Sequence, residues 1–125
     1  MKINNDIGIF IRQKRIQKQI SLRNFSRQVG ISAEYLSKIE NGLRPAPNVE
    51  ILERIATQLL LSTQEKEILY DLAAESKSYL SLAPDLLAYI KENTSIHKAL
   101  RLSKRCGANE EDWLIFIDYL TQKYL

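Results

Sequence analysis

The chain has few of the residues that carry enzyme chemistry or cross-links. Its 125 residues include one cysteine, Cys106, and one histidine, His97. A single cysteine excludes an internal disulfide framework and offers no zinc-binding spacing. His97 lies in a predicted helix, where a solvated side chain is commoner than a catalytic base, and no phosphate-cradling glycine loop or metal-ligand motif accompanies it. We therefore expect no enzyme, no metal site and no cofactor.

Long apolar runs are also missing. No stretch approaches the roughly 18 apolar residues that a membrane-spanning helix needs. The first six residues, MKINND, lack the apolar core of a signal peptide. With 45% apolar and 26% charged residues, the composition is typical of a soluble globular protein. We expect a cytoplasmic protein that binds no membrane.

The charge is unevenly distributed along the chain. Residues 1–62 hold ten Lys or Arg and five Asp or Glu, whereas residues 63–125 hold eight and ten. A basic half beside a mildly acidic half suits a polyanion-binding module joined to a segment with another task. Chance variation in surface charge is the alternative, so this asymmetry only supports other signals.

The stretch from Ser21 to Gly42 predicts two short helices joined by a tight turn. Ser21 and Ser32 can each cap one helix, and Gly30 can take the positive φ that the turn between them demands. The second helix runs to about Glu40 and keeps a polar outer face, which suits a DNA major groove. Its inward partners across both helices are Phe25, Val29, Ile31, Leu36 and Ile39.

Amphipathic patterns predict further helices on both sides of this pair, and no strand pattern interrupts them. The fold class is therefore all-α. The expected helices are Ile7–Gln19 with Asp6 as cap, Val49–Leu61 with Asn48 as cap, one from Ser62 or Thr63, Pro84–Glu92, one capped by Thr94 or Ser95, and one capped by Asn109.

From about Ile7 to Leu61 the chain resembles the phage-repressor/Cro-like helix-turn-helix family of the xenobiotic-response-element type. The most specific piece is KIENG, residues 38–42, which follows the turn at Gly30 at the expected distance. The resemblance implies a five-helix DNA-binding domain, residues 1–76, with a helical C-terminal extension, residues 77–125. It also implies a sequence-specific transcriptional regulator, a dimeric repressor that binds double-stranded DNA at a palindromic operator.

The resemblance further implies roles for particular residues. Lys38 can donate to guanine, Glu34 can accept from cytosine, and Ala33 can touch a thymine methyl. Tyr35 either reaches a sugar or phosphate or leans back into the core. The base-proximal positions are Ala33, Glu34, Tyr35 and Lys38, and the DNA-backbone positions are Ser21, Arg23, Ser32, Ser37, Asn41 and Arg44.

Two positions qualify this resemblance. Leu22 stands where the family usually has a glutamine that contacts a phosphate, so that contact must come from Ser21, Arg23 or the amino end of the helix. Arg15 stands where the family has an arginine paired with the glutamate of the closing motif, here Glu40. Such a pair ties the first helix to the third, whereas the alternative is a solvated Arg15.

The last predicted helix is apolar on more than one side, and such a helix must be buried on more than one side. A symmetric dimer contact meets that need; burial within the same subunit is the alternative. The predicted dimer residues are Trp113, Leu114, Phe116, Ile117, Leu120 and Tyr124. A second functional class remains open. In it the chain is an antitoxin-like or antagonist protein, its tail binds a partner protein, and its DNA-binding domain serves autoregulation.

Overall fold

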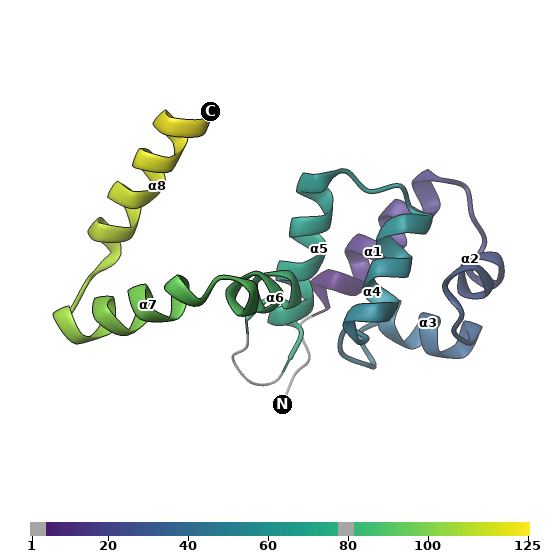
Figure 1. Cartoon of the computed structure of the whole chain (residues 1–125). Helices are drawn as coiled ribbons and strands as arrows, with labels where there is room; N and C mark the ends of the chain where they lie inside the picture. The colour runs from purple at the N-terminus through teal and green to yellow at the C-terminus, as the bar shows by residue number, and fades with distance from the viewer. Residues whose placement is uncertain (1–4, 78–81) are drawn as a thin grey trace. The chain divides into compact units, whose positions relative to one another are not determined.

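A computed structural model describes residues 5–77 and 82–125 of the chain. All regular structure in these residues is helical, so the predicted all-α class is confirmed (Figure 1). The chain divides into two compact units, residues 1–87 and 88–125. The helices are α1 (Asp6–Gln17), α2 (Leu22–Val29), α3 (Ala33–Glu40), α4 (Val49–Gln58), α5 (Thr63–Glu75), α6 (Pro84–Glu92), α7 (Thr94–Cys106) and α8 (Glu110–Tyr124).

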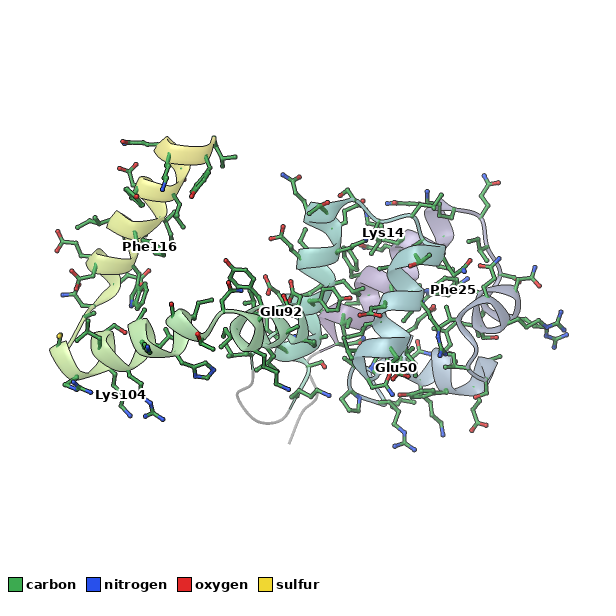
Figure 2. All side chains as sticks on the ribbon, in the orientation of Figure 1. Lys14, Phe25, Glu50, Glu92, Lys104 and Phe116 are labelled. Carbon is green, nitrogen blue, oxygen red and sulfur yellow. The ribbon has the colours of Figure 1, made fainter. Side chains whose placement is uncertain are left out.

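The first unit is built from α1 to α5, which wrap around one apolar core. Helix α3 packs on α1 and α2, while α4 packs on α2 and α5, and α1 also contacts α5 (Figure 1). Phe25 lies among the crowded side chains of this unit (Figure 2) and has no exposed surface. The other large, fully buried apolar side chains are Ile7, Ile11, Val29, Leu36, Ile39, Leu52, Ile55, Leu59 and Leu69. Each contributes about 1.5–3 kcal/mol through burial.

The predicted helix starts around the central turn are observed. Ser21 Oγ accepts a hydrogen bond from the Asn24 amide at 3.1 Å, and Ser32 Oγ accepts one from the Tyr35 amide at 3.0 Å. Gly30 has a φ of 83° at the end of α2, which an L side chain rarely adopts. These local rules place α3 directly after α2 and leave its amino end open to solvent.

Two predicted caps are wrong. The Asn5 carbonyl accepts the first helical hydrogen bond of α1, from Ile9, so Asn5 stands at the cap position and Asp6 lies inside the first turn. Helix α7 begins at Thr94, and the residue before it is Asn93. Asn93 does not cap the helix, because its side-chain amide donates to the Tyr89 carbonyl of α6 at 2.8 Å.

Two predicted helix ends are also wrong. Helix α1 stops at Gln17 instead of Gln19, and Gln19 adopts a φ of 58°, which ends the helix. Helix α4 stops at Gln58, three residues before the expected end, and Leu60 then adopts a φ of 52°. This conformation breaks the helix and lets the Leu61 amide donate back to the Ala56 carbonyl. The turn brings Leu61 into the core and delivers the chain to Ser62, whose side chain caps α5.

In the second unit, α7 and α8 diverge from a turn at Gly107 (Figure 1). Asn109 caps α8 as predicted, and Asp112 completes a capping box by accepting from the Asn109 amide. Neither helix contains a buried residue. Within the described residues, no helix has the length and apolar character required to cross a bilayer.

Candidate nucleic-acid interface

Helix α3 and the loop after it form the walls of one hollow of about 410 Å³. Glu34 and Lys38 lie one turn apart on α3, with Tyr35 between them, and Arg44 extends from the loop. Three of the four predicted base-proximal residues therefore line the same surface as a predicted phosphate contact. The lining residues are Ser32, Glu34, Tyr35, Lys38, Arg44, Pro45 and Ala46. The fourth base-proximal residue, Ala33, follows the cap at the start of α3.

Lys38 and Glu34 form an ion pair in the free protein. Lys38 Nζ lies 3.2 Å from Glu34 Oε1, and the two side chains are 41% and 78% exposed. An exposed pair of this kind contributes about 0.3–0.5 kcal/mol. Breaking this ion pair to form contacts with a base edge would therefore cost little free energy. Tyr35, in contrast, is half-buried and packs against the core, so part of its ring does lean inward.

The loop after α3 folds back over the carboxyl end of that helix. The amides of Leu43 and Arg44 both donate to the Lys38 carbonyl, at 2.8 and 3.3 Å. Arg44 itself is exposed. The Arg44 backbone is thus held by Lys38, whose ammonium group is predicted to be base-proximal, so the two cationic side chains come from adjoining parts of one surface.

Ser37 and Asn41 line a second hollow, of about 180 Å³, together with Arg12, Arg15, Leu22 and Glu40. Asn41 Nδ2 donates to the Ser37 carbonyl at 2.9 Å and to Ser37 Oγ at 3.2 Å. The Ser37 hydroxyl accepts in that bond, so its own hydrogen stays free for a phosphate oxygen. The Asn41 amide, by contrast, is already engaged.

Arg12 is a candidate that the sequence-based analysis missed. It is exposed on α1 and lines the hollow of Ser37 and Asn41. In the sequence it is one of several basic residues in the first helix, and no local pattern separates it from Lys14 or Lys18. The crossing of α1 over α3 is what brings its guanidinium to this surface.

Arg15 and Glu40 form a bidentate ion pair. Arg15 Nε lies 2.9 Å from Glu40 Oε2, and Arg15 Nη2 lies 3.0 Å from Oε1. Arg15 Nη1 also donates to the Ile20 carbonyl at 2.9 Å. The two side chains are only 12% and 4% exposed. The pair therefore holds the carboxyl end of α3 against α1 and sets the direction in which α3 points.

The remaining predicted contacts lie near the amino end of α2. Ser21 and Arg23 are exposed, and Ser21 Oγ retains its hydrogen because it accepts from Asn24. The Leu22 side chain packs against the core instead of facing solvent. Among the described residues, no group of three or more His, Cys, Asp or Glu side chains is placed to hold a metal ion.

The predicted dimer residues lie on α8, where all of them are exposed. Phe116 is one of them and is labelled on that helix in Figure 2. Phe116 packs edge-on to Trp113 with ring centroids 6.5 Å apart and stacks on Tyr119 at 6.4 Å. Ile115 and Tyr119, outside the predicted set, are 61% and 55% exposed. Within one chain, α8 therefore presents an aromatic and aliphatic surface on more than one side.

Comparison with known proteins agrees with this geometry. The sequence model of the family described as Helix-turn-helix matches residues 11–66. The HTH-type transcriptional regulator SlrR of Bacillus subtilis is 36% identical over 117 residues, which cover 94% of this chain and 69% of SlrR. The chain belongs to the helix-turn-helix transcriptional regulators. The resemblance inferred from KIENG and the turn before it is thereby confirmed.

Two further relatives match about half of the chain. An uncharacterized HTH-type transcriptional regulator of Mycobacterium tuberculosis is 40% identical over 63 residues, half of this chain. The chain spans 42% of that regulator's length. The crystal structure of the biofilm master regulator SinR in complex with DNA shares 33% identity, with a TM-score of 0.45. It covers 49% of this chain and 97% of the SinR chain.

Proposed function

We propose that this chain is a sequence-specific DNA-binding transcriptional regulator that acts as a dimeric repressor. The observation that carries the proposal is the shared hollow of Glu34, Lys38 and Arg44, where two candidate base-reading groups and a candidate phosphate contact meet. The basic balance of residues 1–62 supports a polyanionic partner, double-stranded DNA.

In this proposal, α3 enters the major groove with its exposed face. Lys38 donates to guanine O6 or N7, Glu34 accepts from a cytosine amino group, and Ala33 contacts a thymine methyl. Phosphates on either side are held by polar and cationic side chains at the start of α2 and around α3. These are Ser21, Arg23, Ser32, Ser37, Asn41 and Arg44, with Arg12 on α1 as an addition. The Asn41 amide takes part by exchanging its bonds to Ser37 for a phosphate oxygen. Each neutralised phosphate releases counterions, so affinity falls steeply with salt.

Dimerisation through α8 would give the protein a two-fold axis. Two α3 helices then read half-sites about 34 Å apart, one turn of DNA, and a palindromic operator matches that symmetry. Bound at a promoter, the dimer represses by excluding polymerase. We assign residues 1–76 to DNA binding and residues 77–125 to dimerisation.

This proposal includes no catalytic step and no cofactor. A transcriptional regulator acts by occupancy of its site, so its activity requires DNA contacts and a partner subunit rather than reacting groups. We propose the cytoplasm as its compartment because the operator is bacterial or phage DNA.

Selection of bound sites from random double-stranded DNA tests the proposal directly. We expect an enriched palindrome whose half-sites lie one helical turn apart. Retention of DNA without any sequence enrichment, at a salt concentration near physiological, would contradict the sequence-specific role. The selected site then serves as the probe whenever DNA binding of a variant is measured.

Light scattering on the Ile117→Asp variant tests the dimer. Ile117 lies in the apolar stripe of α8 and Gln122 is exposed on the same helix, so Gln122→Asp is the matched control. We expect the wild type and Gln122→Asp to be dimers and Ile117→Asp to be a monomer with weaker operator binding. A dimer that survives Ile117→Asp would place the contact elsewhere.

The apolar width of α8 favours one second candidate. Ile115 and Tyr119 are exposed on α8 but are not among the predicted dimer residues. This additional apolar surface would allow α8 to pack against a helix of a different protein. The chain would then be an antitoxin-like or antagonist protein whose tail binds another protein. A folded wild-type monomer in the same light-scattering experiment would favour this reading over the dimeric repressor.

A further inference from the structure

Ser76 is a buried polar residue at the carboxyl end of α5, 2% exposed. Its hydroxyl donates to the Ala73 carbonyl at 2.7 Å and accepts from the Ala46 amide at 2.9 Å. The first bond is local to α5. The second spans thirty residues and joins α5 to the loop that follows α3.

That loop has one backbone donor at this point. Ala46 lies between Pro45 and Pro47, which have no amide hydrogen. Ser76 therefore accepts from the single N–H group that the three residues can offer. Ala46 is only 6% exposed, so a solvent water cannot readily replace the Ser76 hydroxyl as the acceptor for its amide. A buried donor left without a partner costs about 1–3 kcal/mol.

The two ends of this short segment are held by different helices. On one side, the Leu43 and Arg44 amides donate to the Lys38 carbonyl of α3. On the other, the Ala46 amide donates to Ser76 at the end of α5. Arg44 belongs to the first anchor through its own amide, lies two residues before the second, and contributes an exposed side chain to the hollow that Lys38 and Glu34 also line.

We propose that Ser76 is a positioning residue for DNA binding, which acts through Arg44. This inference rests on the proposed function. The Ser76 hydroxyl fixes the far end of the loop, so the backbone that carries the Arg44 side chain is positioned before DNA arrives. Without that anchor the loop relaxes, and DNA binding must order Arg44 at the cost of conformational entropy.

The test compares Ser76→Ala with a matched control, Ser103→Ala. Ser103 Oγ makes the same type of bond, to the carbonyl three residues earlier at 2.8 Å, on the exposed helix α7. We expect Ser76→Ala to weaken binding to the selected site about three- to tenfold and to lower the salt slope by about one phosphate contact. Ser103→Ala should bind as the wild type does, and Ser76→Thr, which keeps a hydroxyl, should recover most of the affinity.

A double variant separates positioning from general stability. If Ser76 acts through Arg44, Ser76→Ala combined with Arg44→Ala binds no more weakly than Arg44→Ala alone. If the two losses multiply, or the Ser76→Ala salt slope equals that of the wild type, Ser76 has only a structural role and the inference is overturned. Should Ser76→Ala unfold, Ser76→Cys provides a weaker acceptor of similar shape for the same comparison.

Amide hydrogen exchange of the DNA-free protein gives a readout independent of DNA. In Ser76→Ala we expect the Ala46 amide to exchange faster, while the amides of α3 exchange as in the wild type. Unchanged Ala46 exchange would overturn the inference even if the protein binds DNA. A different outcome is faster Ala46 exchange in Ser76→Ala together with a wild type that binds no DNA. That outcome would confirm that Ser76 anchors the loop and would refute the proposed function instead.

Discussion

Lys38 Nζ and Glu34 Oε1 lie 3.2 Å apart on the outer face of α3, so the two candidate base-reading groups pair with each other before DNA binds. This pairing holds the Lys38 side chain along the helix. It therefore reduces the conformational entropy that the side chain would lose on binding DNA. On a guanine-cytosine step both groups can exchange this weak, solvated contact for base-edge hydrogen bonds. If both residues read bases as proposed, we expect the pair to favour DNA in which both exchanges happen together.

Replacing Lys38 with alanine should relax the preference at one base pair. We expect discrimination at that position to fall by about 1–3 kcal/mol, because a donor to guanine is lost. Repeating the site selection with Lys38→Ala measures this. Lys66→Ala, on exposed α5 surface, removes the same charge and should keep the wild-type consensus. An unchanged consensus and affinity in Lys38→Ala would refute the base-reading role.

Replacing Arg44 with alanine should weaken binding to all sequences alike. A phosphate contact carries no sequence information, so the consensus should persist while the salt slope falls by about one. Fluorescence anisotropy with the selected site and with a scrambled site, each over a range of salt, measures both quantities. A loss confined to the selected site would assign Arg44 to base recognition instead.

Replacing Arg15 with alanine should destabilise the fold strongly. The Glu40 carboxylate would remain buried with both of its arginine hydrogen bonds gone, and the free energy of unfolding should fall by about 3–5 kcal/mol. Urea denaturation followed by circular dichroism measures the loss. Arg12→Ala, one turn earlier on the exposed side of α1, should change stability by less than about 0.5 kcal/mol. Equal effects of the two variants would deny the pair its structural role.

Replacing Gly8 with alanine should also destabilise the first unit. A Cβ atom there would clash with the Ile39 carbonyl oxygen and lie 2.8 Å from that of Glu40, both on α3. Alanine favours a helix by about 1 kcal/mol over glycine. We nevertheless expect a net loss of about 1–3 kcal/mol from overpacking, because α1 must move away from α3. A rise in the thermal midpoint of Gly8→Ala would show that the helices are less closely packed.

Glu65 should make stability depend on acid pH. Its hydrogen bond with Lys14 and a second from the Ser62 amide lower its pKa from 4.5 to about 2. The folded state therefore holds the carboxylate more readily than the unfolded chain. The stabilisation is complete above about pH 4.5 and is lost as the pH falls toward 2. Glu65→Gln should be less stable than the wild type at pH 6, and the difference should shrink as the pH falls through about 2. A constant difference across that range, measured by urea denaturation, would contradict the linkage.

Much of the first unit was predictable because its signals are local. Ser21 and Ser32 cap helices through amides three residues away, and Gly30 turns the chain by its own conformation. Helical periodicity likewise identified Phe25 and Leu36 as core residues. Where several nearby residues could cap, as at the starts of α1 and α7, local rules did not select the right one.

Sequence patterns thus predicted an all-α chain, a helix-turn-helix and the residues on the outer face of its second helix. Which distant groups meet became clear from the three-dimensional structure alone: Arg12 and Ser37 line one hollow, Gly8 lies against the backbone of α3, and Ser76 accepts from the Ala46 amide. Capping and helical periodicity act between residues three or four positions apart, so both can be read directly from the order of the residues. Contacts between residues far apart in the chain depend on how the helices cross, and the packing of the whole core sets those crossings.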